Sequence, residues 1–329
     1  WVDNAVLGGE VYDSGVLFRG STLAGSSTES KTFQSYYLLK DGEVNFSDEW
    51  PNINEMSGYI YTDDNDIDIE VNSGASLNLE LGIVIGEVRR NEADENWLSI
   101  NGQAVGPTAS GLNYLQQAPL GERLKNSFST WQAEGDWASD ITVRVPLNIP
   151  NREPEVRLNF SVAENDIVIP EYDLEVNQLT GPVIYDSLSG LESSAMSGEL
   201  FGREVALKLS SQSSDGEIET IFVDAEGAAI KEELIAWPPQ SRFVRDVLTE
   251  MDGDLNYQAK LSLPQGIATD QSNSLLIDSN FTGAALNLPQ PFGKTENESL
   301  ALHVELQFGE RQAVTGTFGD DVQFELNME

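Results

Sequence analysis

The sequence contains no cysteine and a single histidine, His303, among its 329 residues. The absence of cysteine excludes disulfide scaffolds, thiol catalysis and cysteine-based zinc sites. One histidine excludes a metal site built on several histidines, and no G-x-S-x-G elbow supplies a nucleophile for a Ser-His-Asp triad. His303 falls on the polar side of a strand pattern, so we interpret it as a surface residue. We expect no enzyme activity, no metal and no cofactor.

Basic residues are scarce, with 18 Lys and Arg against 55 Asp and Glu, which gives a formal net charge of −37. This balance argues against a nucleic-acid partner and against an anionic membrane surface, because both need clustered basic side chains. Disorder, the other common reason for a high net charge, does not fit a chain with 40% hydrophobic and 9% aromatic residues. The charge therefore bears on solubility and says nothing of the fold.

Long apolar runs are also absent, and no stretch approaches the roughly 20 residues of a membrane span. The chain begins at Trp1, without a methionine, a basic n-region or an apolar h-region. We therefore expect an internal piece of a longer protein, so the lack of a membrane span here says nothing about the parent.

Apolar and polar residues alternate with a period of two along most of the chain, which is typical of antiparallel strands with one wet face. The clearest ranges are 77–85, 141–149, 155–162, 205–209, 257–263, 300–308 and 322–328. Turn signals such as Asp41-Gly42 and Asn101-Gly102 recur every 10 to 15 residues or so, which leaves room for about twenty strands.

The acidic run Asp63–Glu70 resembles a calcium loop but lacks its key residues. A loop that started at Asp64 would need glycine where Ile69 stands and glutamate where Ala75 stands. We predict a strand instead, with the acids pointing out. The six tryptophans fit core positions better than a carbohydrate cleft. Glycoside hydrolysis needs a pair of carboxylates, but with 55 acidic residues the presence of a pair carries no information. A glycan-binding or glycan-hydrolysing protein is therefore the weakest alternative.

Two segments have helical spacing, near 109–130 and near 228–250. Trp237-Pro238-Pro239 should split the second into two short helices. Each segment precedes a glycine that lies 11 residues before a proline, Gly135 before Pro146 and Gly253 before Pro264. We interpret this as an internal duplication within one elongated segment spanning 1–329, with repeat units near 109–227 and 228–329.

A sheet of about twenty strands must curl, split or close, since open sheets rarely exceed about ten. Its apolar side either packs against itself in a filled core or lines an apolar trough. The pattern alone leaves both alternatives open.

The segment 275–294 resembles a hallmark of the YhdP family of AsmA-like envelope proteins. The matching residues are Asp278-Ser279, Gly283, Leu288-Pro289, Pro291 and Lys294, and Phe292 replaces the usual leucine. Two upstream segments resemble the family in the same order, Trp50-Pro51 with Phe46 before it, and Ala118-Pro119-Leu120. The resemblance covers essentially the whole chain.

This resemblance implies a long, curled antiparallel sheet with a groove-like or taco-like section. It also implies a periplasmic segment, tethered to the inner membrane elsewhere in the parent protein, that carries phospholipid toward the outer membrane. Phospholipid acyl chains would be the partners, and the family has no catalytic residues to carry over. The alternative is a structural or adhesive β-domain with a closed core and no ligand. From the alternation we predict these residues to face the groove: Val156, Leu158, Phe160, Leu302, Val304, Leu306 and Phe308.

Overall fold

The computed structural model describes residues 6–23, 25, 27, 31–45, 50–117, 128–147, 149, 152–214, 217–237, 242–265, 272–289, 292–308, 312–319 and 322–328. Several sequence landmarks, including Phe46, Pro119 and Pro291, lie outside these ranges. The chain forms two compact units. Unit 1 comprises residues 1–122, 136–160 and 185–187, and unit 2 comprises residues 123–135, 161–184 and 188–329.

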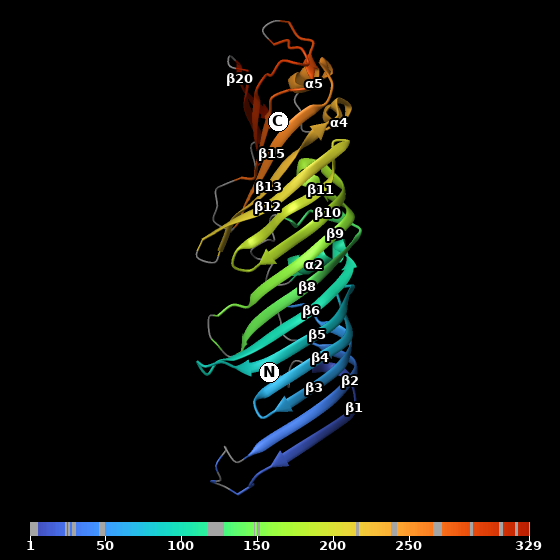
Figure 1. The fold of residues 1–329 in the computed structure, drawn as a ribbon, viewed down its shortest axis with the longest axis vertical. Coiled ribbons are helices and arrows are strands. Elements are labelled where there is room, and N and C mark those ends of the chain that lie inside the picture. The colour runs from blue at the N-terminus through green and yellow to red at the C-terminus, as the bar shows by residue number, and fades with distance from the viewer. Residues whose placement is uncertain are drawn as a thin grey trace. The chain divides into compact units, whose positions relative to one another are not determined.

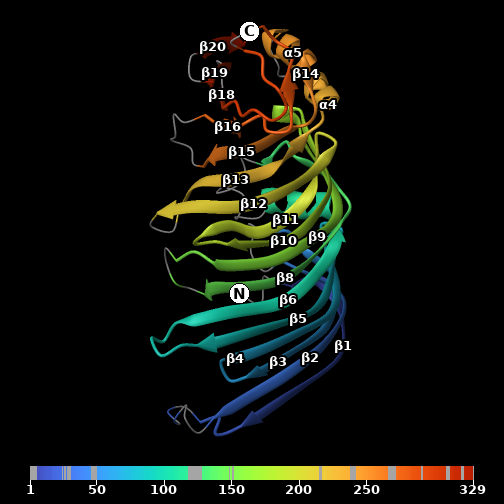
Figure 2. The same cartoon turned by 45° about the horizontal axis from the view of Figure 1, so that its top comes forward.

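Unit 1 is a run of antiparallel strands in which each long strand pairs with the next along the chain. Its elements are β1 (Val6–Arg19), β2 (Thr32–Val44), β3 (Ile53–Asp63), β4 (Asp66–Ser76), β5 (Leu79–Arg90), β6 (Asn96–Pro107), α2 (Thr108–Gln117), β8 (Asp136–Leu147) and the start of β9 (Glu155–Ile169). Figure 1 shows these strands side by side, and Figure 2 shows how several of them bend along their length.

Unit 2 continues with the same strand-to-next-strand pairing from β11 to β20. Its elements after β9 are η2 (Pro170–Tyr172), β10 (Leu174–Asp186), β11 (Gly190–Leu200), β12 (Arg203–Ser214), β13 (Glu217–Ala229), α4 (Lys231–Ala236), α5 (Arg242–Thr249), β14 (Met251–Asp252), β15 (Leu255–Pro264), β16 (Ser274–Ser279), β17 (Ala285–Leu286), β18 (Leu302–Gln307), β19 (Gln312–Phe318) and β20 (Val322–Met328). The short strand β7 (Gln132–Glu134) pairs with β9.

The predicted fold class is confirmed: the described residues are mainly β, with an antiparallel sheet of 18 strands that does not close into a barrel. The remaining two strands, β14 and β17, pair with each other. The described helices are short and lie in the predicted segments, α2 in the first and α4 and α5 in the second. The predicted split is also confirmed, since α4 ends at Ala236 and α5 begins at Arg242.

Tight two-residue turns set the register of several hairpins. Phe201-Gly202 joins β11 to β12 with both residues at positive φ, +52° and +72°, as in a type I′ turn. Leu77-Asn78 joins β4 to β5 in the same way, at +48° and +64°. Turns of this type match the right-handed twist of the strands they join, so they hold the antiparallel neighbours in register.

The predicted strand over 77–85, with every odd residue on one face, is wrong. Leu77 belongs to the turn, and a bulge between Leu81 and Val84 reverses the facing of the residues that follow. Ile83 and Ile85 are therefore 62% and 38% exposed, while Val84 turns toward the buried cluster. Alternation in the sequence does not reveal a bulge. The extra residue moves the later side chains to the opposite face of the sheet, while apolar and polar residues go on alternating along the chain.

The two glycines of the predicted duplication have similar backbones. Gly135 lies between β7 and β8 with φ +101°, and Gly253 lies between β14 and β15 with φ +98°. Each glycine therefore lies between a short strand and the long strand that follows it, in a backbone conformation that favours glycine. The division into repeat units stays a prediction.

Candidate functional site

Unit 1 presents one apolar face, the side of its sheet on which Leu39, Met56 and Val71 form a buried cluster. Cross-strand partners carry this face from strand to strand, because directly opposed residues point to the same side. One row in register runs from β3 to β8 through Ile60, Ile69, Gly86, Ile100 and Val143. A parallel row beside it holds Ile67, Val88, Leu98 and Val145.

The apolar face of unit 1 extends onto β1, where it is largely exposed. Val16 lies opposite Ser35, and Phe18 lies opposite Phe33. Val16 is 65% exposed and Phe18 is 47% exposed. Farther along the face, Ile60, Ile69 and Ile100 are only half-buried. Contiguous apolar surface of this kind is uncommon on a monomer without a binding role.

Helix α2 covers the other end of this face. A Cβ added at Gly111 of α2 would come within 2.8 Å of the Trp137 ring, so only glycine permits this approach. The Trp137 ring packs edge-on against Phe160, with 5.5 Å between ring centroids. Tyr114 of α2 contacts Trp50 at 6.2 Å between centroids. These contacts hold α2 against Trp137 of β8 and against Trp50, and Trp137 in turn packs on β9.

Unit 2 carries its own apolar face from β12 to β19. One row in register contains Leu209, Val223, Leu261, Leu275, Leu306 and Val314, and the next contains Leu207, Ala225, Ala259, Ile277, Val304 and Gly316. Most members of the first row are fully buried, including Leu261, Leu275 and Leu306. This face is therefore more covered than that of unit 1.

Tyr172 of η2 makes the contacts that cover part of the face in unit 2. Its ring lies 4.5 Å from the Phe308 ring, and its hydroxyl accepts a 2.6 Å hydrogen bond from Asn273 Nδ2. Its backbone carbonyl accepts a 2.9 Å bond from Trp237 Nε1. Tyr172 is 2% exposed, and burial raises the pKa of its hydroxyl to about 12. This bridge joins segments that lie 65 to 136 residues apart.

The predicted groove residues all lie on these apolar faces, three of them in unit 1 and four in unit 2. Val156, Leu158 and Leu306 are buried, at 3%, 7% and 4% exposure. The others are half-buried, namely Phe160, Leu302, Val304 and Phe308. Phe160 packs on Trp137 and Phe308 packs on Tyr172, so both already have protein neighbours. Their role in a lipid groove stays a prediction.

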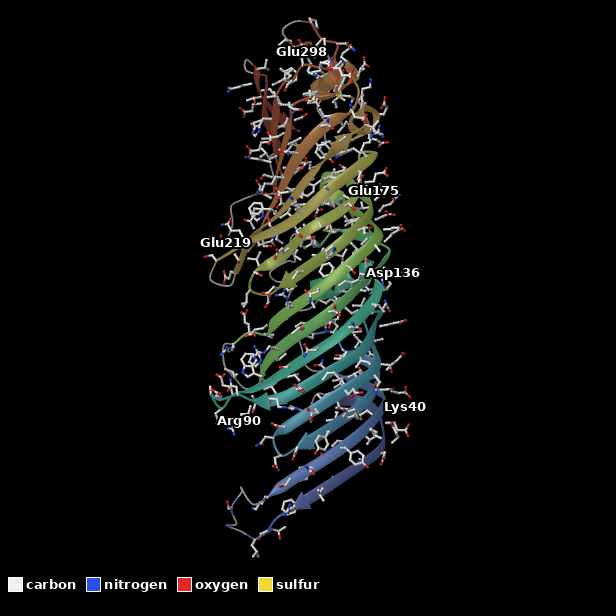
Figure 3. The ribbon with its side chains drawn as sticks, in the orientation of Figure 1. Lys40, Arg90, Asp136, Glu175, Glu219 and Glu298 are labelled. Carbon is white, nitrogen blue, oxygen red and sulfur yellow. The ribbon has the colours of Figure 1, made fainter. Side chains whose placement is uncertain are left out.

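The opposite side of each sheet is polar. Arg89 pairs with Asp68 across β5 and β4, an interaction that raises the pKa of the guanidinium. The predicted outward direction of the acids on β4 fits this pair, although Asp64 lies in the β3–β4 turn and accepts a bond from the Phe33 N–H. Figure 3 labels Asp136, which lies at the start of β8 next to the apolar-side Trp137. This face accounts for much of the acidic charge.

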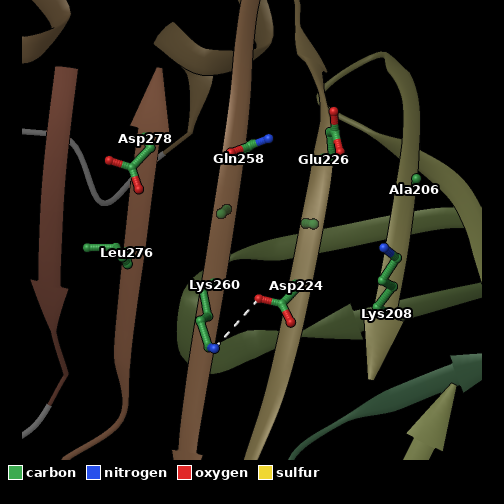
Figure 4. Close-up of a pocket in the computed structure, with 10 residues that line it drawn as sticks. Ala206, Lys208, Asp224, Glu226, Gln258, Lys260, Leu276 and Asp278 are labelled. Carbon is green, nitrogen blue, oxygen red and sulfur yellow. Dashed lines mark ion pairs between the residues drawn. The ribbon is translucent and has the colours of Figure 1, made fainter. Parts of the chain in front are cut away.

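A hollow of about 310 Å³ lies on the polar face of unit 2, over β12, β13, β15 and β16. Lys260 points toward Asp224 there, 3.9 Å from its carboxylate, and Lys208 lies beside them (Figure 4). At the rim, His303 Nδ1 lies 2.7 Å from Asp278. His303 is exposed, as predicted. In the part of the chain that the structure describes, no group of three or more metal-ligating side chains occurs.

Lys294, the last residue of the sequence hallmark, is buried at 8% exposure. Its Nζ donates hydrogen bonds to the backbone carbonyls of Phe281, at 2.8 Å, and Ala284. Burial lowers the pKa of this ammonium, partly offset by Glu298 and Glu296. The lysine thus fastens the loop after β16, whose Phe281 packs against Phe318 of β19. Sequence reasoning found the residue but not this role.

A protein-family model described as YhdP protein matches residues 1–329. The chain belongs to the YhdP family. The motif ending at Lys294 was therefore a sound guide to an AsmA-like envelope family. Searches of curated proteins and of solved structures gave no significant match. No helix among the described residues of this YhdP-family chain is long and apolar enough to span a membrane.

Proposed function

We propose that this chain is a periplasmic segment of a lipid-transport protein, in which phospholipid acyl chains move along the apolar face toward the outer membrane. The parent protein would be tethered to the inner membrane by a part outside this chain. The observation that carries the proposal is the apolar face of unit 1, which continues across seven strands. It is exposed at Val16 and Phe18 of β1 and half-buried at Ile60, Ile69 and Ile100, although neighbours such as Val71, Val88 and Leu98 are buried.

The physical role of such a face is to replace water around an acyl chain. Each methylene that leaves apolar surroundings costs about 0.8 kcal/mol, so a chain of about sixteen carbons faces a barrier on the order of 12 kcal/mol in water. An apolar surface without specific ligands lowers this barrier along its whole length. Headgroups would stay at the polar margins, and no catalytic group is required.

A second candidate is a structural domain whose apolar sides are filled by its own residues. The Tyr172 bridge to Phe308 and Asn273 favours this candidate for unit 2. The two candidate functions predict different amounts of phospholipid bound to the purified protein. A transport segment retains phospholipid after detergent-free purification, whereas a filled structural domain retains none.

The test is photocrosslinking in cells with matched neighbours on opposite faces. A photoreactive residue at Ile69 or Phe160 would face the apolar side, and one at Glu70 or Asn159 would face the polar side. We expect lipid adducts from the first pair and few from the second. Equal labelling from both faces, or no lipid from any position, would contradict the proposal.

A further inference from the structure

The polar side of the sheet in unit 1 carries a group of tyrosines that the apolar face does not explain. Tyr36 of β2 lies directly opposite Tyr61 of β3, and Tyr59 follows on the same side of β3. Leu17 of β1 lies beside them, since its partner Gln34 precedes Tyr36 on this side. Leu17 and Tyr36 are 57% and 40% exposed, and the other two tyrosines are half-buried. We call Leu17 and these three tyrosines the tyrosine patch.

Acidic side chains border the tyrosine patch on β4. Asp68 lies directly opposite Tyr61, and Glu70 lies directly opposite Tyr59. A hydrogen bond to Glu70 raises the pKa of the Tyr59 hydroxyl. Arg89 pairs with Asp68, whereas no ion pair to Glu70 occurs among the described residues. The patch therefore combines aromatic rings with negative charge that is only partly neutralised.

Two other aromatic rings on the polar side show what such a combination binds within this chain. In unit 1, the guanidinium groups of Arg144 and Arg152 each lie 4.8 Å from the centroid of the Trp97 ring. In unit 2, the Lys260 ammonium lies 4.3 Å from the centroid of the Phe222 ring. Each of these three cations also pairs with a carboxylate, at 2.8 to 4.0 Å, as Figure 4 shows for Lys260.

Within the described residues, the tyrosine patch has rings and carboxylates but no cation over a ring, because the cation–ring contacts are those at Trp97 and Phe222. Lys40, the basic residue of β2, pairs with Asp41 instead. A cation over an exposed ring gains from the ring electrons, and tyrosine is enriched at protein interfaces. Anionic lipid headgroups would be repelled by the same carboxylates.

We propose that the tyrosine patch is a docking surface for a protein segment that presents lysine or arginine between apolar side chains. The cation lies over the Tyr36 and Tyr61 rings near the Glu70 carboxylate, and the apolar neighbours cover Leu17. The patch is on the side of the sheet opposite the proposed lipid face. Docking is therefore independent of the proposed transport, and partner and lipid can bind at the same time.

The test uses a short labelled peptide in which lysine alternates with valine, and a matched peptide with glutamine in place of lysine. We expect the full chain to bind the lysine peptide about tenfold more tightly than the glutamine peptide, by a margin that shrinks as salt rises. Tyr36→Leu and Tyr61→Leu keep apolar area but remove a ring, so each should weaken binding of the lysine peptide about three- to tenfold. Tyr36→Phe keeps the ring and should retain the affinity.

A pair of charge variants tests the role of the carboxylate. Glu70→Gln should weaken binding of the lysine peptide about three- to tenfold and leave the glutamine peptide unchanged. Glu80→Gln is the matched control, because Glu80 is an exposed acid on β5 and its loss changes the net charge equally. We expect the control to change the affinity by less than about twofold.

The Tyr36 ring lies over Gly15, so melting temperatures show whether Tyr36→Leu disturbs β1. If it does, Tyr61→Leu and Glu70→Gln decide the outcome. No binding of the lysine peptide, equal binding of the two peptides, or binding that survives Tyr61→Leu and Glu70→Gln overturns the proposal. Tyrosine-dependent binding of chitotetraose without binding of the lysine peptide would assign the patch to glycans, and it overturns the proposal as well.

Discussion

The role of Lys294 gives the sharpest prediction about the fold. In Lys294→Met the aliphatic stem is replaced by a chain of similar length, but the ammonium and its bonds to the carbonyls of Phe281 and Ala284 are lost. The Phe281 carbonyl keeps a 3.2 Å bond from the Ala284 N–H, whereas the Ala284 carbonyl loses its lysine partner. Ala284 is fully buried, so solvent does not replace that bond.

The magnitude follows from these bonds. A hydrogen bond to a charged group contributes about 1.5 to 3 kcal/mol, and two are lost. The desolvation cost of a buried ammonium, which the substitution removes, offsets part of that loss. We therefore expect Lys294→Met to lower the free energy of unfolding by about 2 to 4 kcal/mol.

Urea unfolding followed by tryptophan fluorescence measures this change, and hydrogen exchange locates it in the loop after β16. Lys208→Met is the matched control, because Lys208 is exposed on the polar face. We expect the control to change stability by less than about 0.5 kcal/mol. If Lys294→Met proves as stable as Lys208→Met, the lysine does not fasten the loop, and the physical reading of the hallmark is wrong.

Two further predictions concern backbone strain and alkaline pH. Gly253→Ala should lower the free energy of unfolding by about 1 to 3 kcal/mol, because the φ of Gly253 is +98° and the new Cβ would lie 2.7 Å from the Gly283 carbonyl oxygen. Gly82→Ala is the control and should leave the free energy of unfolding nearly unchanged. The pKa values of Tyr114, Tyr172 and Tyr257 are each raised from 10.0 to about 12, mainly by burial. The folded state thus holds these protons more tightly, and stability should fall as pH rises from about 10 to 12, by up to about 3 kcal/mol per group. Urea unfolding at pH 9 and 11 checks this, and a wild-type loss no larger than that of the tyrosine-to-phenylalanine variants would contradict it.

The positions and the sidedness of most strands were predictable from sequence. Val304 and Leu306 alternate with polar residues, and their facing partners on β16 and β19 are apolar as well. Local alternation and tight turns determine such features, because both depend on neighbours within a few residues. The same holds for the break between α4 and α5, which the consecutive prolines in the sequence predict.

Contacts between distant segments were not predictable. Tyr172 meets Asn273 across 101 residues, and nothing in either local pattern signals the pair. The bulge after Leu81 escaped notice because Ile83 and Ile85 continue the alternation while facing solvent. Lys294 appeared as part of a motif, but a lysine in sequence gives no sign that its charge is buried against carbonyls.

The central claim is that lipid occupies the apolar face and not the polar one. Crosslinking in cells from Ile69 and from its neighbour Glu70 tests it most directly, since the two residues share a strand and differ in the face they present. The account predicts phospholipid adducts at Ile69 with few or none at Glu70. Adducts of similar yield at both positions, or protein adducts alone at Ile69, would contradict it.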